Sequence, residues 1–148
     1  MLKFILPTEE DTAAFGRRLA RLARKGDVFA LFGTLGMGKS VLARAFVQEL
    51  TAAPEVPSPT FTLVQSYEAP DFEIYHFDLY RLKSSEEIFE IGMEEALYEG
   101  VSLIEWPEKM GAYLPRGAFR ISIANHPQGR ELSIETASPS TAERFKSL

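Results

Sequence analysis

The sequence predicts an α/β fold: a three-layer sandwich with a mixed, mostly parallel central sheet, antiparallel hairpins and helices on both faces. Three observations lead to this prediction. A short apolar run, Asp27–Phe32, precedes a glycine-rich segment and an amphipathic helical pattern. A second, mostly apolar run, Val101–Ile104, is typical of a strand buried on both sides in a parallel sheet. Two pairs of strand-like runs, each joined by a short polar link, are typical of hairpins.

The composition is that of one globular domain. The chain has 148 residues, of which 45% are hydrophobic, so we expect a single domain over residues 1–148, with 137–148 as a loosely held C-terminal tail. It has no Cys, which excludes disulfides and thiolate zinc sites. A net charge of -5 argues against non-specific binding of nucleic acid. Without a secretory signal or an apolar stretch of about 18 residues, a cytoplasmic protein that crosses no membrane is expected.

Strands and helices are expected to alternate in the first half of the chain. Lys3–Leu6 predicts a short strand, and Thr8 is a typical N-cap for a helix that ends at Gly26. The strand at Asp27–Phe32 is followed by a helix from about Gly38 to Leu50. Basic side chains on the first helix predict a solvated face, with a contact to a partner or RNA as the alternative. They are Arg17, Arg18, Arg21, Arg24 and Lys25.

The second half begins after a loop that contains Pro54, Pro57 and Pro59. Two strand-like runs then predict an antiparallel hairpin, and a helical segment follows from Ser84 or Ser85 to about Tyr98, interrupted near Gly92. After the strand at 101–104, a closing hairpin is expected. The runs that form the two hairpins are Phe61–Tyr67 with Glu73–Tyr80, and Ala118–Ala124 with Glu131–Thr136.

The segment Gly33–Ser40 matches the phosphate-loop pattern G-x-x-x-x-G-K-[ST] and lies between a predicted strand and a predicted helix. Its glycines allow backbone N–H groups to point at phosphate oxygens, and the helix N-terminus adds partial positive charge. Lys39 would reach the β- and γ-phosphates, and the Ser40 hydroxyl would ligate Mg²⁺. The motif therefore predicts a P-loop NTPase-like fold that binds a nucleoside triphosphate together with Mg²⁺.

Two carboxylates are candidates for the metal site. Glu105 ends a strand expected to lie parallel to the phosphate-loop strand, and ligands bind at the carboxyl ends of such strands. We assign Mg²⁺ to Ser40 and Glu105, with Asp78 nearby to position water. The alternatives are a hairpin carboxylate with ordinary hydrogen bonds for Asp78, and a helix cap or ion pair for Glu105. Core packing is an alternative role for Trp106, and His76 is either a buried, hydrogen-bonded histidine or a functional one.

A hydroxyl between the phosphate-loop helix and the first hairpin is a candidate γ-phosphate sensor. Thr60 follows Pro59, which restricts the backbone in front of it. P-loop proteins often use a loop at this place to respond to the γ-phosphate. An ordinary strand start is the alternative.

Four motifs in register resemble the TsaE (YjeE) family, bacterial P-loop ATPases required for threonylcarbamoyladenosine modification of tRNA. They are GTLGMGKS at 33–40, SPTFTLVQSY at 58–67, HFDLYRL at 76–82 and LIEWPE at 103–108. The likeness covers about residues 4 to 136. It implies an ATP-binding and ATP-hydrolysing subunit needed for threonylcarbamoyl transfer to adenosine 37 of tRNA. Such a subunit resets a TsaB–TsaD complex between rounds, binds ATP at its interface with TsaD, and meets tRNA only indirectly through the complex.

The resemblance also implies roles for single residues. Lys39, Thr60, Asp78 and Glu105 fall on positions expected to be catalytic, and Ser40 and Glu105 on the metal site. Thr34, Met37 and Ser40 depart from the usual aspartate, alanine and threonine, although Ser40 keeps the hydroxyl. The expected nucleotide-binding residues are Glu9, Leu35, Gly36, Met37, Gly38, Lys39, Ser40, Val41, Glu105 and Arg130.

Two other classes of function remain open at this point. A small-molecule kinase would need an acceptor site and usually an Arg-rich lid, and no Arg cluster follows the third strand. A nucleotide-sensing binding module with negligible hydrolysis of its own is the other alternative. An ATPase that partner subunits complete would behave much like such a module when it is studied alone.

Overall fold

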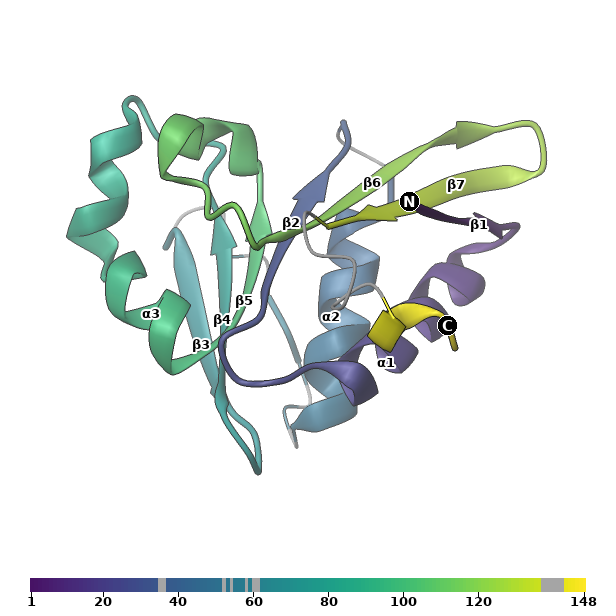
Figure 1. The fold of residues 1–148 in the computed structure, drawn as a ribbon, viewed down its shortest axis with the longest axis horizontal. Helices are drawn as coiled ribbons and strands as arrows, with labels where there is room; N and C mark the ends of the chain where they lie inside the picture. Colours follow the sequence, from purple (N-terminus) through teal and green to yellow (C-terminus); the bar gives the residue numbers. More distant parts are fainter. Residues whose placement is uncertain (35–36, 52, 54, 58, 60–61, 137–142) are drawn as a thin grey trace.

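A seven-stranded sheet runs through the described part of the molecule in the order β1-β7-β6-β2-β5-β4-β3 (Figure 1). This computed structural model describes residues 1–34, 37–51, 53, 55–57, 59, 62–136 and 143–148. Thr60, Leu35 and Gly36 therefore lie outside the described residues. The strands are β1 (Leu2–Leu6), β2 (Val28–Phe32), β3 (Val64–Glu68), β4 (Glu73–Asp78), β5 (Gly100–Glu105), β6 (Phe119–His126) and β7 (Gly129–Glu135).

The middle of the sheet is parallel and its edges are antiparallel. β2 pairs in parallel with β5 and β6, and β4 pairs in parallel with β5. The pairs β3–β4, β6–β7 and β1–β7 are antiparallel. The predicted mixed sheet and both hairpins are thus confirmed, and the parallel and antiparallel pairings are equal in number among the described residues. Because β2, β4 and β5 run the same way, their carboxyl ends lie at one edge of the sheet.

Helical segments cover both faces of the sheet. α1 and α2 lie together on one side, whereas η1, α3 and η2 lie on the other (Figure 1). Adjacent side chains of β5 belong to different cores, since Leu103 packs with the α1–α2 side and Ile104 with the α3 side. None of the described helices is long and apolar enough to cross a membrane. The helical segments are α1 (Glu9–Leu22), α2 (Lys39–Leu50), α3 (Met93–Glu99), η1 (Ser85–Ile91), η2 (Pro107–Tyr113) and η3 (Glu143–Phe145).

α1 begins as the sequence predicts. The Thr8 side chain accepts a hydrogen bond from the Asp11 N–H, and the Asp11 carboxylate accepts one from the Thr8 N–H, which together form a capping box. The helix ends at Leu22, four residues before the predicted stop at Gly26. It packs closely on α2, because a Cβ on Gly16 would lie 2.6 Å from the Leu42 carbonyl oxygen. This close packing fixes the N-terminus of α1 beside the N-terminus of α2.

The predicted helix over 84–98 is divided where the sequence indicated. Gly92 has a φ of 74° and separates the 3-10 segment η1 from the short helix α3. This left-handed conformation suits glycine, which has no Cβ to clash with its neighbours. Both segments pack on the sheet face opposite α1, through Ile88 and Met93.

The end of the chain differs from the prediction. Residues 137–148 were expected to be a loosely held tail, yet Phe145 is fully buried against Phe29 and Phe119. Arg144 forms an ion pair with Asp27, at the start of the phosphate-loop strand. The prediction of a loose tail is therefore wrong for residues 143–148, whereas 137–142 lie outside the described residues. The Ser/Pro/Thr-rich composition favoured the prediction of a loose tail, because it gives little weight to a single phenylalanine.

Candidate functional site

The phosphate-loop segment leads from β2 into α2, as predicted. Gly38 is the N-cap of α2 and has a φ of 104°, a left-handed conformation that favours glycine. No side chain caps this helix N-terminus among the described residues. Its first N–H groups consequently keep their capacity to donate to an anion, and the helix dipole adds partial positive charge.

Lys39 is a buried cation without a hydrogen-bond partner. Its side chain is largely enclosed, with only 4% of the residue exposed, and its Nζ finds no partner among the described residues. The Nζ lies 3.9 Å from the centre of the Trp106 ring, an arrangement that stabilises a cation on an aromatic face. Burial lowers the pKa of Lys39, and the carboxylates of Glu105, Glu108 and Asp78 oppose this shift. An anion entering the site would supply the missing partner.

Two carboxylates lie side by side at the carboxyl ends of β4 and β5. Asp78 and Glu105 are direct register partners of the parallel pair, and both are buried. Asp78 Oδ1 accepts a hydrogen bond of 3.0 Å from the Tyr80 N–H. Glu105 Oε1 accepts a long one of 3.4 Å from the Ser40 hydroxyl. The pairing of β4 with β5 and the position of α2 thus bring three oxygen-bearing side chains to one end of the sheet.

Trp106 turns the chain out of β5. It has left-handed backbone angles, a φ of 59° and a ψ of 48°, which are uncommon for a residue other than glycine. Such a conformation costs on the order of 1–3 kcal/mol and is often found at functional sites. Its ring contacts Tyr80, with ring centres 5.0 Å apart, and covers Lys39. Trp106 therefore lines the site, and it also packs against the hydrophobic cluster on the α3 side, so the core-packing alternative holds as well.

The opposite wall of the site comes from the two ends of the sequence. The antiparallel pairing of β1 with β7 places Leu6 opposite Arg130. Glu9 begins α1 immediately after the Thr8 cap, and the Arg130 Nη1 donates to the Gly129 carbonyl at 3.2 Å. Residues more than 120 positions apart in the sequence thereby face the same space.

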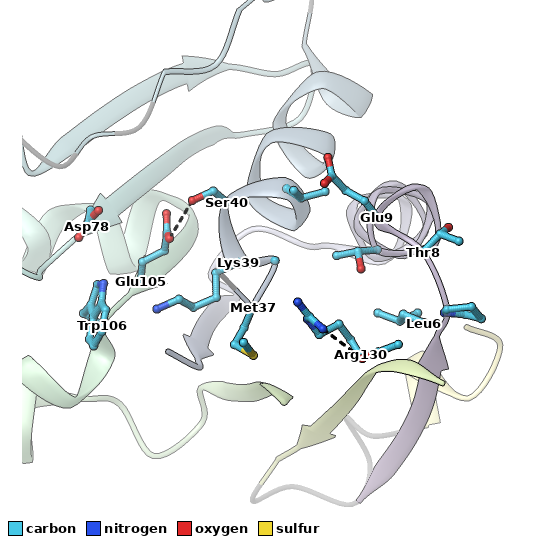
Figure 2. A pocket seen from close by; sticks show the side chains of 15 residues that line it. Leu6, Thr8, Glu9, Met37, Lys39, Ser40, Asp78, Glu105, Trp106 and Arg130 are labelled. Carbon is cyan, nitrogen blue, oxygen red and sulfur yellow. Dashed lines mark hydrogen bonds between the residues drawn. The ribbon is translucent and has the colours of Figure 1, made fainter. Parts of the chain in front are cut away.

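These two walls enclose a pocket of about 520 Å³ (Figure 2). In Figure 2, Lys39 and Ser40 point from the start of α2 toward Trp106 and Glu105, while Glu9 and Arg130 lie on the other side. The described lining residues are Leu6, Pro7, Thr8, Glu9, Thr12, Met37, Gly38, Lys39, Ser40, Val41, Asp78, Glu105, Trp106, Gly129 and Arg130.

The metal prediction can be compared with the chemistry of these side chains. The described residues contain no cluster of three or more His, Asp or Glu that could hold a metal ion. Mg²⁺, however, commonly binds through one or two protein ligands, with waters and substrate phosphates completing its shell. The Ser40 hydroxyl and the buried Glu105 carboxylate, 3.4 Å apart, are donors of this kind. The residues present therefore fit such an ion.

A model of the family described as "Threonylcarbamoyl adenosine biosynthesis protein TsaE" matches residues 6–132. The chain belongs to the TsaE family. The resemblance found from the four motifs is thereby confirmed, and so is the family's role in threonylcarbamoyladenosine biosynthesis on tRNA. The match begins at Leu6 and extends beyond Arg130, so it includes both walls of the pocket.

Relatives of the TsaE family are similar over most of this chain. The TsaE protein of Rickettsia bellii is 41% identical over 120 residues, covering 80% of this chain and 83% of the relative. The protein of the same name from Treponema pallidum is 36% identical and covers 90% and 99%, respectively. The crystal structure of YdiB from Bacillus subtilis superposes with a TM-score of 0.75 at 25% identity, over 99% of this chain and 90% of the other. The predicted α/β fold is thus confirmed.

All described residues that the sequence predicted for nucleotide binding line the pocket, and Asp78 does too. Leu35, Gly36 and Thr60 lie outside the described residues, so their predicted roles stay predictions. His76 lies behind Glu105 and is not among the lining residues. Sequence reasoning missed Leu6, Pro7 and Gly129, because only the pairing of β1 with β7 brings them here. Local pattern carries no signal for that pairing.

Proposed function

We propose that this TsaE-family chain binds Mg-ATP in the pocket and hydrolyses it as part of the machinery that transfers threonylcarbamoyl to adenosine 37 of tRNA. The observation that carries the proposal is Lys39, a buried ammonium without a hydrogen-bond partner among the described residues. It lies at the uncapped N-terminus of α2, where a phosphate would meet both the ammonium and the backbone N–H groups.

Ser40 and each charged side chain of the pocket have a role in this proposal. Lys39 binds the β- and γ-phosphates and stabilises charge on the transferred group. Ser40 and Glu105 would hold Mg²⁺, which when bound neutralises phosphate charge. Asp78 orients the attacking water by accepting a hydrogen bond from it. Arg130 and Glu9, on the wall remote from Glu105, bind the part of the nucleotide that lies away from the γ-phosphate.

The partners in the proposal are a TsaB–TsaD complex, carried over from the family resemblance. Hydrolysis resets that complex between rounds, and tRNA is reached only through it. The net charge of -5 supports this division of labour, because a chain that is acidic overall is poorly suited to hold a polyanion by itself.

The test compares Lys39→Ala with Lys25→Ala, a change at an exposed lysine outside the pocket. Calorimetry should show Mg-ATP binding to the parent and to Lys25→Ala, with a loss of about 100-fold or more for Lys39→Ala. A second assay follows co-sedimentation with a TsaB–TsaD heterodimer, which should depend on Mg-ATP and on Lys39. Unchanged ATP affinity in Lys39→Ala would remove the phosphate loop from the mechanism. Association with the heterodimer that is equally strong with and without nucleotide would contradict the proposal that hydrolysis resets the complex.

A further inference from the structure

Behind the pocket, a histidine contacts one of the proposed metal ligands. His76 lies on β4 and is 2% exposed, and its Nε2 is 2.6 Å from Glu105 Oε2. It precedes Asp78 by two residues, so both side chains are on the same face of β4. The pocket lining described above does not include it, and the proposed function gives it no task.

The surroundings of the ring indicate which nitrogen carries the proton. The Nδ1 atom is buried and has no hydrogen-bond partner among the described residues. A proton there would be a buried donor without an acceptor, which is costly. An Nε2–H instead donates to the Glu105 carboxylate and leaves Nδ1 as an unused acceptor, the cheaper arrangement.

The contact divides the two oxygens of Glu105 between two tasks. Oε2 accepts from His76, whereas Oε1 faces the Ser40 hydroxyl. Among the described residues, His76 alone holds Oε2, so without it the carboxylate would be free to rotate about its side-chain bonds. Rotation would move Oε1 away from the Ser40 hydroxyl.

We propose that His76 is a positioning residue that fixes the Glu105 carboxylate for Mg²⁺. The inference rests on the proposed function, because it needs Glu105 to be a metal ligand. Residues that orient a metal-bound side chain typically change metal affinity by about 10- to 100-fold when they are removed. Removal of a histidine that only fills the core would instead lower the stability of the fold. It would change nucleotide affinity equally with and without metal.

The first experiment separates these roles with two substitutions. His76→Leu removes the donor and keeps an apolar side chain, whereas His76→Gln retains an N–H donor near the position of Nε2. The control is His126→Gln, at the only other histidine of the chain, whose Nδ1 accepts from the Gln128 N–H at the β6–β7 turn. Calorimetry with ADP is run in EDTA and over a series of Mg²⁺ concentrations.

We expect all variants to bind ADP in EDTA within about twofold of the parent. The Mg²⁺ concentration that produces half of the gain in affinity should rise about 10- to 100-fold in His76→Leu. His76→Gln should restore most of the response, and His126→Gln should match the parent. An unchanged Mg²⁺ response in His76→Leu would overturn the positioning role and leave the proposed function intact. A parent protein that binds ADP without any response to Mg²⁺ would overturn both.

A second measurement needs no substitution that could unfold the protein. With two histidines in the chain, imidazole resonances of ¹⁵N-labelled protein can be assigned by means of His126→Gln. Addition of Mg²⁺ to the ADP-bound parent should shift the ring signals of His76 and leave those of His126 unchanged. The shift should be much smaller in Glu105→Gln. His76 ring signals that do not change when Mg²⁺ is added would contradict the proposal that His76 positions a metal ligand.

Discussion

Two buried clusters, one aromatic and one polar, combine residues of the same sheet with residues of the helical segments that pack on it. The aromatic cluster consists of Phe29, Phe119 and Phe145, whose ring centres are 4.8 to 6.2 Å apart. The polar cluster consists of Lys39, His76, Asp78 and Glu105, which are also buried. The rings of the aromatic cluster carry no polar atoms, and beside them only the Nε of Arg144 is buried without a hydrogen-bond partner among the described residues. In the polar cluster, Lys39 Nζ and His76 Nδ1 have none among the described residues.

The difference separates what stabilises this fold from what serves its site. Burial of apolar surface contributes about 25 cal/mol per Å², so the aromatic cluster favours folding outright. Burial of charged and polar groups costs free energy unless each one is paired. The polar cluster carries that cost at the carboxyl ends of β4 and β5, where a ligand can supply the missing partners. Substitutions in the two clusters should therefore affect different measurements.

The largest effect is expected in the aromatic cluster. Phe145→Ala should lower the free energy of unfolding by about 3–5 kcal/mol, the usual cost of removing a buried aromatic ring. Urea denaturation measures it, and ADP affinity of the folded variant should stay within about twofold. Phe89→Ala is the control, because Phe89 is 44% exposed, and it should cost about 1 kcal/mol or less. A similar loss in both variants would show that the chain end is not part of the core.

A smaller effect, on binding instead of stability, is expected in the polar cluster. Glu105→Gln should reduce the gain in ADP affinity that Mg²⁺ produces by at least about 10-fold, since a neutral amide is a poorer magnesium ligand than a carboxylate. Titration of Mg²⁺ against ADP-bound protein measures this gain. The control Glu108→Gln removes an exposed carboxylate that also acts on Lys39 and should stay within about twofold. Equal losses in the two variants would indicate that the total charge near Lys39, and not direct ligation by Glu105, determines the response to Mg²⁺.

The smallest effect is expected at Thr8, a residue that belongs both to a helix cap and to the pocket. Thr8 lines the pocket and caps α1, so Thr8→Ala should cost about 1 kcal/mol of unfolding free energy and leave the Mg²⁺ response unchanged. Asp11→Ala removes the other half of the capping box. Because each side chain needs the other, the double variant should lose less than the sum of the two single losses. Additive losses in denaturation experiments would argue against a reciprocal cap.

Much of the architecture could be predicted because its signals are local. Thr8 followed by Asp11 marks the start of α1, and the apolar run at 27–32 marks β2. The position of Glu105 beside the phosphate loop also followed from the sequence, since a strand buried on both sides in a parallel sheet ends at the ligand-binding edge. The bounds were less accurate: α1 ends four residues early, and β4 ends at Asp78 instead of Tyr80.

Other features depend on contacts between distant parts of the chain. The end of the chain contains one phenylalanine in a polar stretch, and only its edge-on contacts with the stacked rings of Phe29 and Phe119 make it an anchor. The hydrogen bond between His76 and Glu105 joins residues that are 29 positions apart in the sequence, on the paired strands β4 and β5. Trp106 adopts its left-handed backbone where β5 ends against the site, a conformation that its residue type disfavours.

The sequence by itself determined the helices and strands of the core, the phosphate loop and the family, because periodicity, caps and motif spacing act over a few residues. Only the tertiary structure decided that β1 pairs with β7, and thereby that Leu6 and Glu9 face the same pocket as Arg130. It also decided that Lys39 is buried beneath Trp106 without a hydrogen-bond partner among the described residues. The physical reason is that strand pairing and burial are set by the packing of the whole chain, which no short stretch of sequence contains.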